Sequence, residues 1–295
     1  MRPMSAIALE HPRTRTTAVR GGIGRALLFV LVLAALWGLW EGYRWLWIRE
    51  GWTKPFVVND ITMPHLYGIF HQLFVPARVN GPQLITLLCH SALFTAKEAA
   101  VGFGIGATVG FALGVILSHF GVLRRGLLPY VVASQTIPII AIAPIVVVGL
   151  GNYNIAAWLR VAVIAAYLTF FPVTVNTLRG LQSADPRAIE LMHSYAAGGW
   201  AILWKLRVPS ALPYLFSAFK VSATASVVGA IIGEAPSSIP DGLGGAIINF
   251  NQYYTLEPKN LWATNLVAAC LGIFFFLAVV VVERLVVRRA PEHLA

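Results

Sequence analysis

Long apolar runs follow one another along this chain and are separated by shorter polar segments. Six of the runs have the length, about 20 residues, that a helix needs to cross the hydrocarbon core of a bilayer. We therefore expect an all-α, polytopic membrane protein with six transmembrane helices. The expected spans are residues 26–48, 96–118, 126–149, 156–178, 211–234 and 261–283.

The polar segments predict how the chain is divided. No small-residue cleavage site ends the first apolar run, so we interpret it as a retained span and not as a signal peptide. The predicted regions are an N-terminal tail (1–25), the first helix (26–48), a proline-bearing loop (49–83), a domain (84–285) that opens with a helical lead-in (84–95) and contains a polar insert (185–210), and a C-terminal tail (286–295).

Composition supports the same class of protein. Of the 295 residues, 58% are hydrophobic and 12% are charged, whereas about 25% of the residues in a soluble domain are charged. The net charge of +10 would suit a nucleic acid if the basic residues formed one patch. They follow the loops on one side of the expected helices instead, so we expect a lipid bilayer as partner and no nucleic acid.

The positions of Lys and Arg predict the orientation. If the N-terminus is inside, cytoplasmic segments hold fourteen basic residues and outside segments hold four, an excess that is typical of cytoplasmic loops. We therefore expect both termini and the insert to be cytoplasmic. The fourteen are Arg2, Arg13, Arg15, Arg20, Arg25, Arg124, Arg125, Arg179, Arg187, Lys205, Arg207, Arg284, Arg288 and Arg289, and the four are Arg49, Lys54, Arg78 and Lys259.

Four glycines in the second expected span recur at every fourth position. Residues four apart share one face of a helix, and small residues let helix backbones approach closely in lipid. We therefore expect a helix-packing seam at Gly102, Gly106, Gly110 and Gly114. The letters GFGIG also resemble a phosphate loop, but no Lys-Ser/Thr follows them and they lie inside a span.

Two prolines interrupt the third expected span. Each removes a backbone donor from the helix, and irregular backbone at membrane depth is tolerated only where protein or a water-filled route covers it. We interpret Gln135, Pro138 and Pro144 as part of a bent segment that lines a pathway. The alternative is a kinked helix that serves only for packing.

Charges within the expected spans are candidates for function. We expect Lys97 and Glu98 to satisfy a span boundary as neighbours, and Arg160 and Lys220 to anchor their helices by extending toward the interface. Glu234 precedes a loop rich in Pro, Gly and Ser. It is interpreted either as part of a gate or outer lip or as an ordinary helix cap.

No group of residues predicts catalysis or metal binding. Cys89 and Cys270 lie far apart in apolar sequence, so we expect them to be packing residues. His65 and His71 are six positions apart and would not share a helix face. No nucleophile converges with an acid or base, so we expect no enzyme activity, no catalytic residue and no metal site.

The insert predicts a bent helical pair. Asp185 suits an N-cap and Pro186 suits the first helical position, so a first helix is expected over 186–197. The pair Gly198–Gly199 permits a bend, and a second helix is expected over 200–207, ending before the proline that follows. Such an amphipathic element presents itself to a protein partner or, alternatively, lies on lipid headgroups.

The same residues resemble the EAA loop of ABC importer permeases, whose pattern is EAA, three residues, Gly, nine residues, I-x-LP. Glu190 matches the Glu, Ala196 stands at the Gly, and Pro209 matches the Pro, while Leu191 and Met192 replace the alanines. Because the Gly is lost, we expect the bend to move to Gly198–Gly199. The stretches QTIPIIAIAPIVVVGLG, FFPVTVNTLRGL and DGLGGAI are also similar to this family.

The resemblance is to the nitrate/sulfonate/taurine branch, which includes permeases for thiamine-precursor pyrimidines and riboflavin. It implies a type I ABC importer permease fold with cytoplasmic coupling helices, in the inner membrane of a bacterium. It further implies that the chain is the pathway subunit for a small organic or anionic solute. The ATPase-coupling residues it implies are Glu190, Leu191, Tyr195, Ala196, Ala197, Gly198, Gly199 and Pro209.

The implied partners are an ABC ATPase dimer, a second permease copy that makes a homodimer, and an extracytoplasmic substrate-binding protein. The chain itself would bind no cofactor, because ATP and Mg²⁺ belong to the ATPase. The alternatives are a stand-alone secondary transporter or channel and a membrane enzyme. The first would typically show internal repeats or coupled acids at the membrane midplane.

Overall fold

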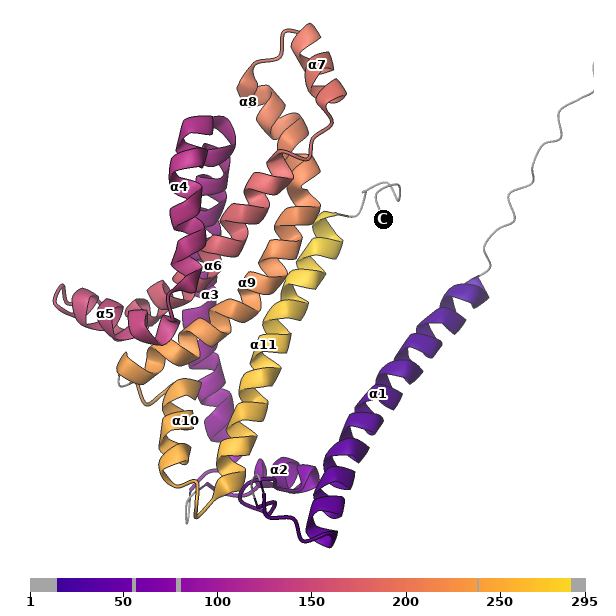
Figure 1. Cartoon of the computed structure of the whole chain (residues 1–295), viewed down its shortest axis with the longest axis vertical. Helices are drawn as coiled ribbons and strands as arrows, with labels where there is room; N and C mark the ends of the chain where they lie inside the picture. Colours follow the sequence, from indigo (N-terminus) through magenta and orange to yellow (C-terminus); the bar gives the residue numbers. More distant parts are fainter. Residues whose placement is uncertain (1–14, 55–56, 78–80, 238, 288–295) are drawn as a thin grey trace, which may run out of the picture. The chain divides into compact units, whose positions relative to one another are not determined.

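The computed structural model describes residues 15–54, 57–77, 81–237 and 239–287. Residues 1–14 and 288–295, which hold most of the two predicted tails, lie outside the described residues. The chain divides into two compact units, residues 1–68 and 69–295 (Figure 1). Regular secondary structure in the described part is entirely helical, apart from one isolated bridge between Pro76 and Gln83.

The helices confirm the expected all-α class. Five of those described are long and apolar enough to cross a membrane, and a bent pair makes a sixth if it counts as one span. The helices are α1 (Arg15–Arg49), α2 (Leu66–Gln72), α3 (Leu84–His119), α4 (Gly121–Ala133), η1 (Ser134–Thr136), α5 (Ile139–Gly151), α6 (Ala157–Leu181), α7 (Pro186–Ser194), α8 (Gly199–Ile202), η2 (Leu203–Arg207), α9 (Val208–Ser237), α10 (Leu243–Gln252) and α11 (Pro258–Val286).

The third expected span is the bent pair. Its two halves, Gly121–Thr136 and Ile139–Gly151, meet at 101°. The break lies at Pro138, and Ile137 before it is extended, as a residue preceding proline usually is. The expectation of a second break at Pro144 is wrong, because this proline lies inside α5. A helix can carry an internal proline by giving up one backbone hydrogen bond and bending.

The core of residues 69–295 is the packing of α3, α6 and α9. All four glycines of the expected seam are buried on α3. A Cβ added at Gly102 would lie 2.5 Å from Ala162 O, and one at Gly106 would lie 2.5 Å from Ala166 O. Side chains cannot come so close, so α3 and α6 touch at backbone distance and only glycine fits at these positions.

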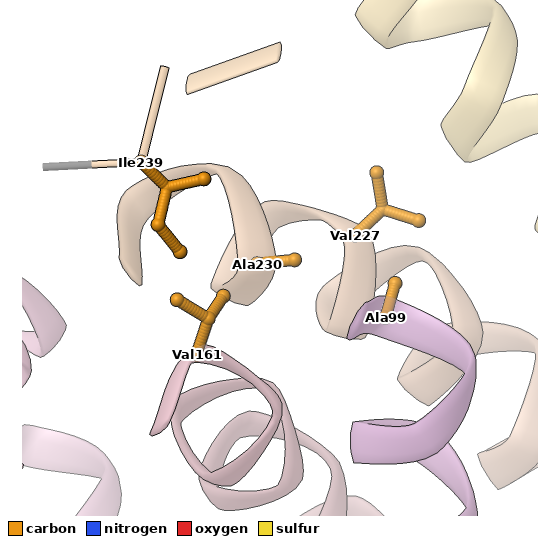
Figure 2. Close-up of a cluster of buried hydrophobic side chains, with 5 residues drawn as sticks. All are labelled: Ala99, Val161, Val227, Ala230 and Ile239. Carbon is orange, nitrogen blue, oxygen red and sulfur yellow. The ribbon is translucent and has the colours of Figure 1, made fainter. Parts of the chain in front are cut away.

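Farther along these helices the core is apolar. Figure 2 shows a cluster in which side chains of α3, α6, α9 and the segment after α9 meet. Because the members are small or β-branched, the three helices stay close together at this level too. The cluster consists of Ala99, Val161, Val227, Ala230 and Ile239.

Charged side chains connect the outer helices to this core. Lys220 of α9 forms an ion pair of 2.8 Å with Glu283 of α11, a partner that the sequence did not predict, and its role as an anchor at the membrane interface stays a prediction. Arg160 of α6 donates a hydrogen bond of 3.2 Å to Val147 O of α5. Cys89 and Cys270, expected to be packing residues, are both exposed in the single chain.

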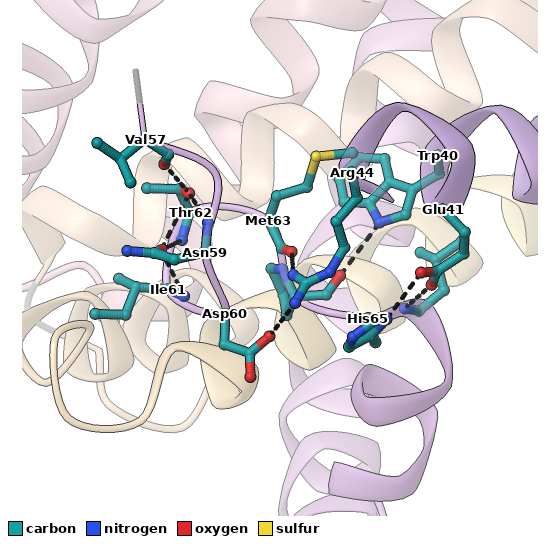
Figure 3. Close-up of polar contacts among 12 residues, drawn as sticks. Trp40, Glu41, Arg44, Val57, Asn59, Asp60, Ile61, Thr62, Met63 and His65 are labelled. Atoms are coloured by element: carbon teal, nitrogen blue, oxygen red, sulfur yellow. Dashed lines mark hydrogen bonds and ion pairs between the residues drawn. The ribbon is translucent and has the colours of Figure 1, made fainter. Parts of the chain in front are cut away.

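The first unit is built around the last turns of α1 (Figure 3). The buried guanidinium of Arg44 donates to Met63 O and, at 2.6 Å, to Asp60 Oδ1. Glu41 Oε2 lies 2.8 Å from His65 Nδ1. The segment after α1 is therefore folded back onto the helix that precedes it. Within the residues that the structure describes, no group of three or more metal-ligating side chains comes together.

Candidate functional site

The insert begins with the cap that the sequence predicts. The Asp185 carboxylate accepts a hydrogen bond of 2.9 Å from Arg187 N, and Pro186 occupies the first helical position. The helix that follows, α7, ends at Ser194 and is shorter than the expected 186–197. The cap fixes the direction in which α7 leaves the end of α6.

The bend of the insert lies at Ala196. This residue has a φ of 53°, in the left-handed region. Ala196 N donates to His193 O at 2.9 Å and Ala197 N donates to Met192 O at 3.0 Å, which is the hydrogen-bond pattern of a Schellman C-cap. The expectation of a bend moved to Gly198–Gly199 is wrong, because Gly198 is extended and serves as the N-cap of α8.

The second half of the insert continues into a membrane helix. Helix α8, the π-helical turn η2 and α9 form one helix over Gly199–Ser237. The expectation that the second helix ends before Pro209 is therefore wrong. The wider π-turn immediately before this proline is a known way to accommodate an interruption of the helical hydrogen bonds without ending the helix.

The insert carries large side chains on its surface. Helices α7 and α8 project beyond the ends of α6 and α9 (Figure 1). Leu191 is 58% exposed, Tyr195 is 79% exposed and Trp200 is 72% exposed. The rings of Trp200 and Trp204 stack edge to face at 5.7 Å. Exposed apolar groups gathered at one end of a protein are typical of a surface that another molecule covers.

The other expected coupling residues share this surface. Ala197 is half-buried, and the remaining ones are exposed, namely Glu190, Ala196, Gly198, Gly199 and Pro209. Below them, Leu203 of η2 is buried with Leu181 of α6 and with Leu215 of α9. The insert is thus exposed on its outer face and attached on its inner face to two core helices, so a displacement of the insert would move both.

The expected pathway residues do not form one site. Gln135, Pro138 and Pro144 are exposed on the bent α4–α5 segment, where large apolar side chains such as Ile140 are also exposed. Glu234 is fully buried instead, and its hydrogen bonds lead to α3 and α10. The pathway interpretation stays a prediction for the bent segment, while Glu234 requires a separate explanation.

Glu234 holds the N-terminus of α10. Its Oε1 accepts from Thr95 Oγ1 at 2.6 Å, and its Oε2 accepts from Gly244 N at 2.5 Å. Thr95 Oγ1 in turn accepts from Leu243 N at 2.9 Å. A carboxylate at a helix N-terminus satisfies free backbone donors and complements the helix dipole. Through these contacts Glu234 caps α10 and not its own helix, and its role as part of a gate or outer lip stays a prediction.

Sequence reasoning missed Glu98. It was expected at a span boundary beside Lys97, but it is fully buried within α3 and interacts with Glu234. The Nζ of Lys97 lies 4.3 Å from the centre of the Trp158 ring. The sequence did carry a signal, because Glu98 lies four residues before Gly102 and therefore continues the buried glycine face.

Comparison with known proteins decides the family. Residues 104–291 match the model of the binding-protein-dependent transport system inner membrane component. The chain belongs to this family. The permease is thus a multi-pass inner membrane protein and the transmembrane subunit of an ATP-driven ABC importer, not an enzyme. Membership sets aside the alternatives of a stand-alone secondary transporter, a channel and a membrane enzyme.

Named relatives support this assignment. The permease is 34% identical to the formylaminopyrimidine transport permease protein ThiX of Halalkalibacterium halodurans, over 67% of its own length and 78% of the relative. It is 30% identical to the riboflavin transport system permease protein RibX of Chloroflexus aurantiacus, over 68% and 73%. It is 24% identical to the putative aliphatic sulfonates transport permease protein SsuC of Bacillus subtilis, over 88% of each chain.

Proposed function

We propose that the insert is the surface on which the permease receives its ATPase. The observation that carries this proposal is that exposed side chains, Leu191, Tyr195 and Trp200, lie on the insert, whose second half is continuous with α9. ATP and Mg²⁺ would be bound by an ATPase dimer, and closure of that dimer would displace the insert. Because α8, η2 and α9 are one helix, the displacement would reach the membrane-spanning core directly.

The charge distribution supports a cytoplasmic location for the insert. On the span map predicted from the sequence, fourteen Lys and Arg residues fall in the segments assigned to the side of the insert and both termini, against four in the segments assigned to the other side. The ATPase would therefore approach from the cytoplasm. On the same orientation, α10 lies toward the outside, because it is at the other end of α9 (Figure 1).

A second copy of the permease would complete the pathway. The bent α4–α5 segment exposes Ile140, Ile145 and Val148, each at least 65%, and this apolar surface is suited to contact with a second copy or with lipid. A homodimer would cover part of this surface and enclose the rest. Gln135 and Pro138 at the bend would then line the route between the two copies.

The solute we propose is a small organic molecule of the pyrimidine or flavin type, delivered by an extracytoplasmic binding protein. The relatives named for formylaminopyrimidine and riboflavin are 34% and 30% identical to the permease. Those named for aliphatic sulfonates and taurine are 24% and 25% identical. A sulfonate or another small anion is the second candidate, since these relatives match a comparable share of the chain.

Two tyrosines of equal exposure test the docking proposal. Tyr195 on the insert and Tyr153 between α5 and α6 are both 79% exposed. Tagged permease is purified from its native membranes in mild detergent, and the ATP hydrolysis that co-purifies is measured. Tyr195→Ala should lower the retained ATPase about tenfold, since interface aromatics often contribute more than about 1 kcal/mol to binding. Tyr153→Ala should retain it.

A charge reversal at Glu190 sharpens the same experiment. Glu190 is exposed, so Glu190→Lys should leave the amount of permease in the membrane unchanged while lowering the ATPase that it retains. If ATPase retention survives Tyr195→Ala and Glu190→Lys together, the insert is not the docking surface.

A further inference from the structure

Two acidic side chains from different helices meet inside the core of the permease. Glu98 of α3 and Glu234 of α9 are both 0% exposed, and each is the other's neighbour. Burial of one carboxylate in a membrane domain is costly, and burial of two adjacent ones is more so. The pair therefore needs a physical explanation that the docking and pathway proposals do not supply.

The hydrogen bonds around the pair are divided unequally. Glu234 accepts from Thr95 Oγ1, from Gly244 N and from Gly245 N, so it has the partners that an anion requires. Glu98 accepts no hydrogen bond from any donor among the described residues. Thr95 is not available to it, because this hydroxyl donates to Glu234 and accepts from Leu243 N.

Glu98 forms no ion pair with a cation among the described residues. Its neighbour in the chain, Lys97, attracts it electrostatically, but the Lys97 ammonium lies over the Trp158 ring and donates no hydrogen bond to Glu98. Arg160 of α6 is directed to Val147 O of α5. Helix α10 carries no titratable residue, and Asp241 before it is exposed. The group that faces Glu98 is thus another carboxyl.

We propose that the pair holds a single proton, carried by Glu98, which donates it in a hydrogen bond to the Glu234 carboxylate. A protonated carboxyl is a donor, so this arrangement supplies both the partner that Glu98 lacks and a further donor for Glu234. Two carboxyls in one buried site share a proton for the same reason in other proteins, because both cannot be ionised side by side. Glu98 is then a positioning residue, which acts through Glu234.

The proton would set the position of one wall of a cavity. The first turn of α10, held by Glu234, also borders a cavity of about 530 Å³ that is lined by His90, Asp241 and Asn249 among others. A Cβ added at Gly244 would lie 2.8 Å from Glu234 Oε2, so the turn rests directly on the carboxylate. Loss of the proton would place two anions beneath this turn and loosen it.

Infrared spectroscopy of the full-length permease in lipid nanodiscs at neutral pH tests where the proton lies. The wild type should show the carbonyl band of a buried protonated carboxyl group. The band should vanish in Glu98→Gln and persist in Glu234→Gln. The control Glu283→Gln removes a carboxylate that is paired with Lys220 and should leave the band unchanged. A wild type without the band, or a band that survives Glu98→Gln, would overturn the proposal.

Thermal unfolding tests what the proton does, and separates it from a bound cation. Glu98→Gln keeps a donor toward Glu234, so its melting temperature should stay within a few degrees of the wild type, whereas Glu98→Ala and Glu234→Gln should both lower it clearly. In alkaline buffer the wild type should lose stability before Glu98→Gln does. If Glu98→Gln is as damaging as Glu98→Ala, and the wild type is stabilised by NaCl but not by choline chloride, a sodium ion and not a proton joins the pair.

Discussion

The two ends of α9 are built in opposite ways. At the start, the continuous α8–η2–α9 helix exposes Trp200 and Trp204, and a Cβ added at Gly199 would meet no described atom within 4 Å. At the finish, Glu234 is fully buried, and the glycines of the turn that follows are in close contact with it. One end leaves apolar groups uncovered, and the other encloses polar groups completely.

The difference indicates how the two ends are completed. Exposed aromatic side chains gain free energy when another protein removes them from water, so the first end is suited to association. The buried Glu234 carboxylate gains nothing from a partner, because its hydrogen bonds are already made within the chain. The second end is therefore self-sufficient, and the same helix connects the exposed surface proposed for docking to a site that is completed within the chain.

The substitution with the largest expected effect disrupts the packing of α3 against α6, on which both ends of α9 depend. Gly106→Ala would place a Cβ 2.5 Å from Ala166 O and 2.6 Å from Thr169 Cβ, forcing α3 and α6 apart. We expect the free energy of unfolding in detergent to fall by about 3 kcal/mol, the upper range for overpacking. Gly104→Ala is the matched control, since this glycine of the same helix has open space around it. Equal losses for the two variants would contradict the packing seam.

The second-largest expected effect distinguishes the two ends of α9 by the free energy of unfolding that a substitution costs at each. Gly244→Ala would bring a Cβ within 3.0 Å of Glu234 Cβ and closer still to its Oε2, and we expect a loss of about 2 kcal/mol in the free energy of unfolding. Gly199→Ala at the docking end has no described neighbour to displace and should change this quantity by less than about 0.5 kcal/mol. A larger loss at Gly199 than at Gly244 would reverse the comparison.

The smallest effect concerns the bend within the insert. Ala196 adopts a left-handed φ of 53°, which costs an alanine about 1 kcal/mol relative to glycine. Ala196→Gly should therefore raise the free energy of unfolding of the permease by up to about 1 kcal/mol. Asn154, with a φ of 55°, provides the comparison: asparagine tolerates this conformation better, so Asn154→Gly should gain less. Hydrogen exchange of the insert checks whether the gain is local.

Patterns with a fixed period could be read from the sequence. The four-residue repeat of glycines placed them on one face of α3, and the Asp185–Pro186 pair marked the start of α7. The all-α class and the family followed from the apolar runs and the spacing of the insert. These features are local, so neighbouring residues determine them without knowledge of the rest of the fold.

The features that sequence reasoning missed depend on distant parts of the chain or on backbone conformation. Glu98 was placed at a boundary because its partner, Glu234, is 136 positions away and only the fold brings them together. The bend was expected at glycines because Ala196 is not a residue that favours a left-handed φ. Pro209 was expected to end a helix, since nothing in the residues before it announces a π-turn.

That π-turn affects the direction in which the side chains before it point around the helix axis. Each residue of an α-helix advances the side-chain direction by about 100°, and a π-turn adds roughly one residue to the count. Because α9 packs against α6, the five residues of η2 (Leu203–Arg207) therefore determine in which direction around the helix axis Trp200 points. If the ATPase docks on the insert as proposed, the direction of its approach depends on the winding of this turn as well as on the residues that it contacts.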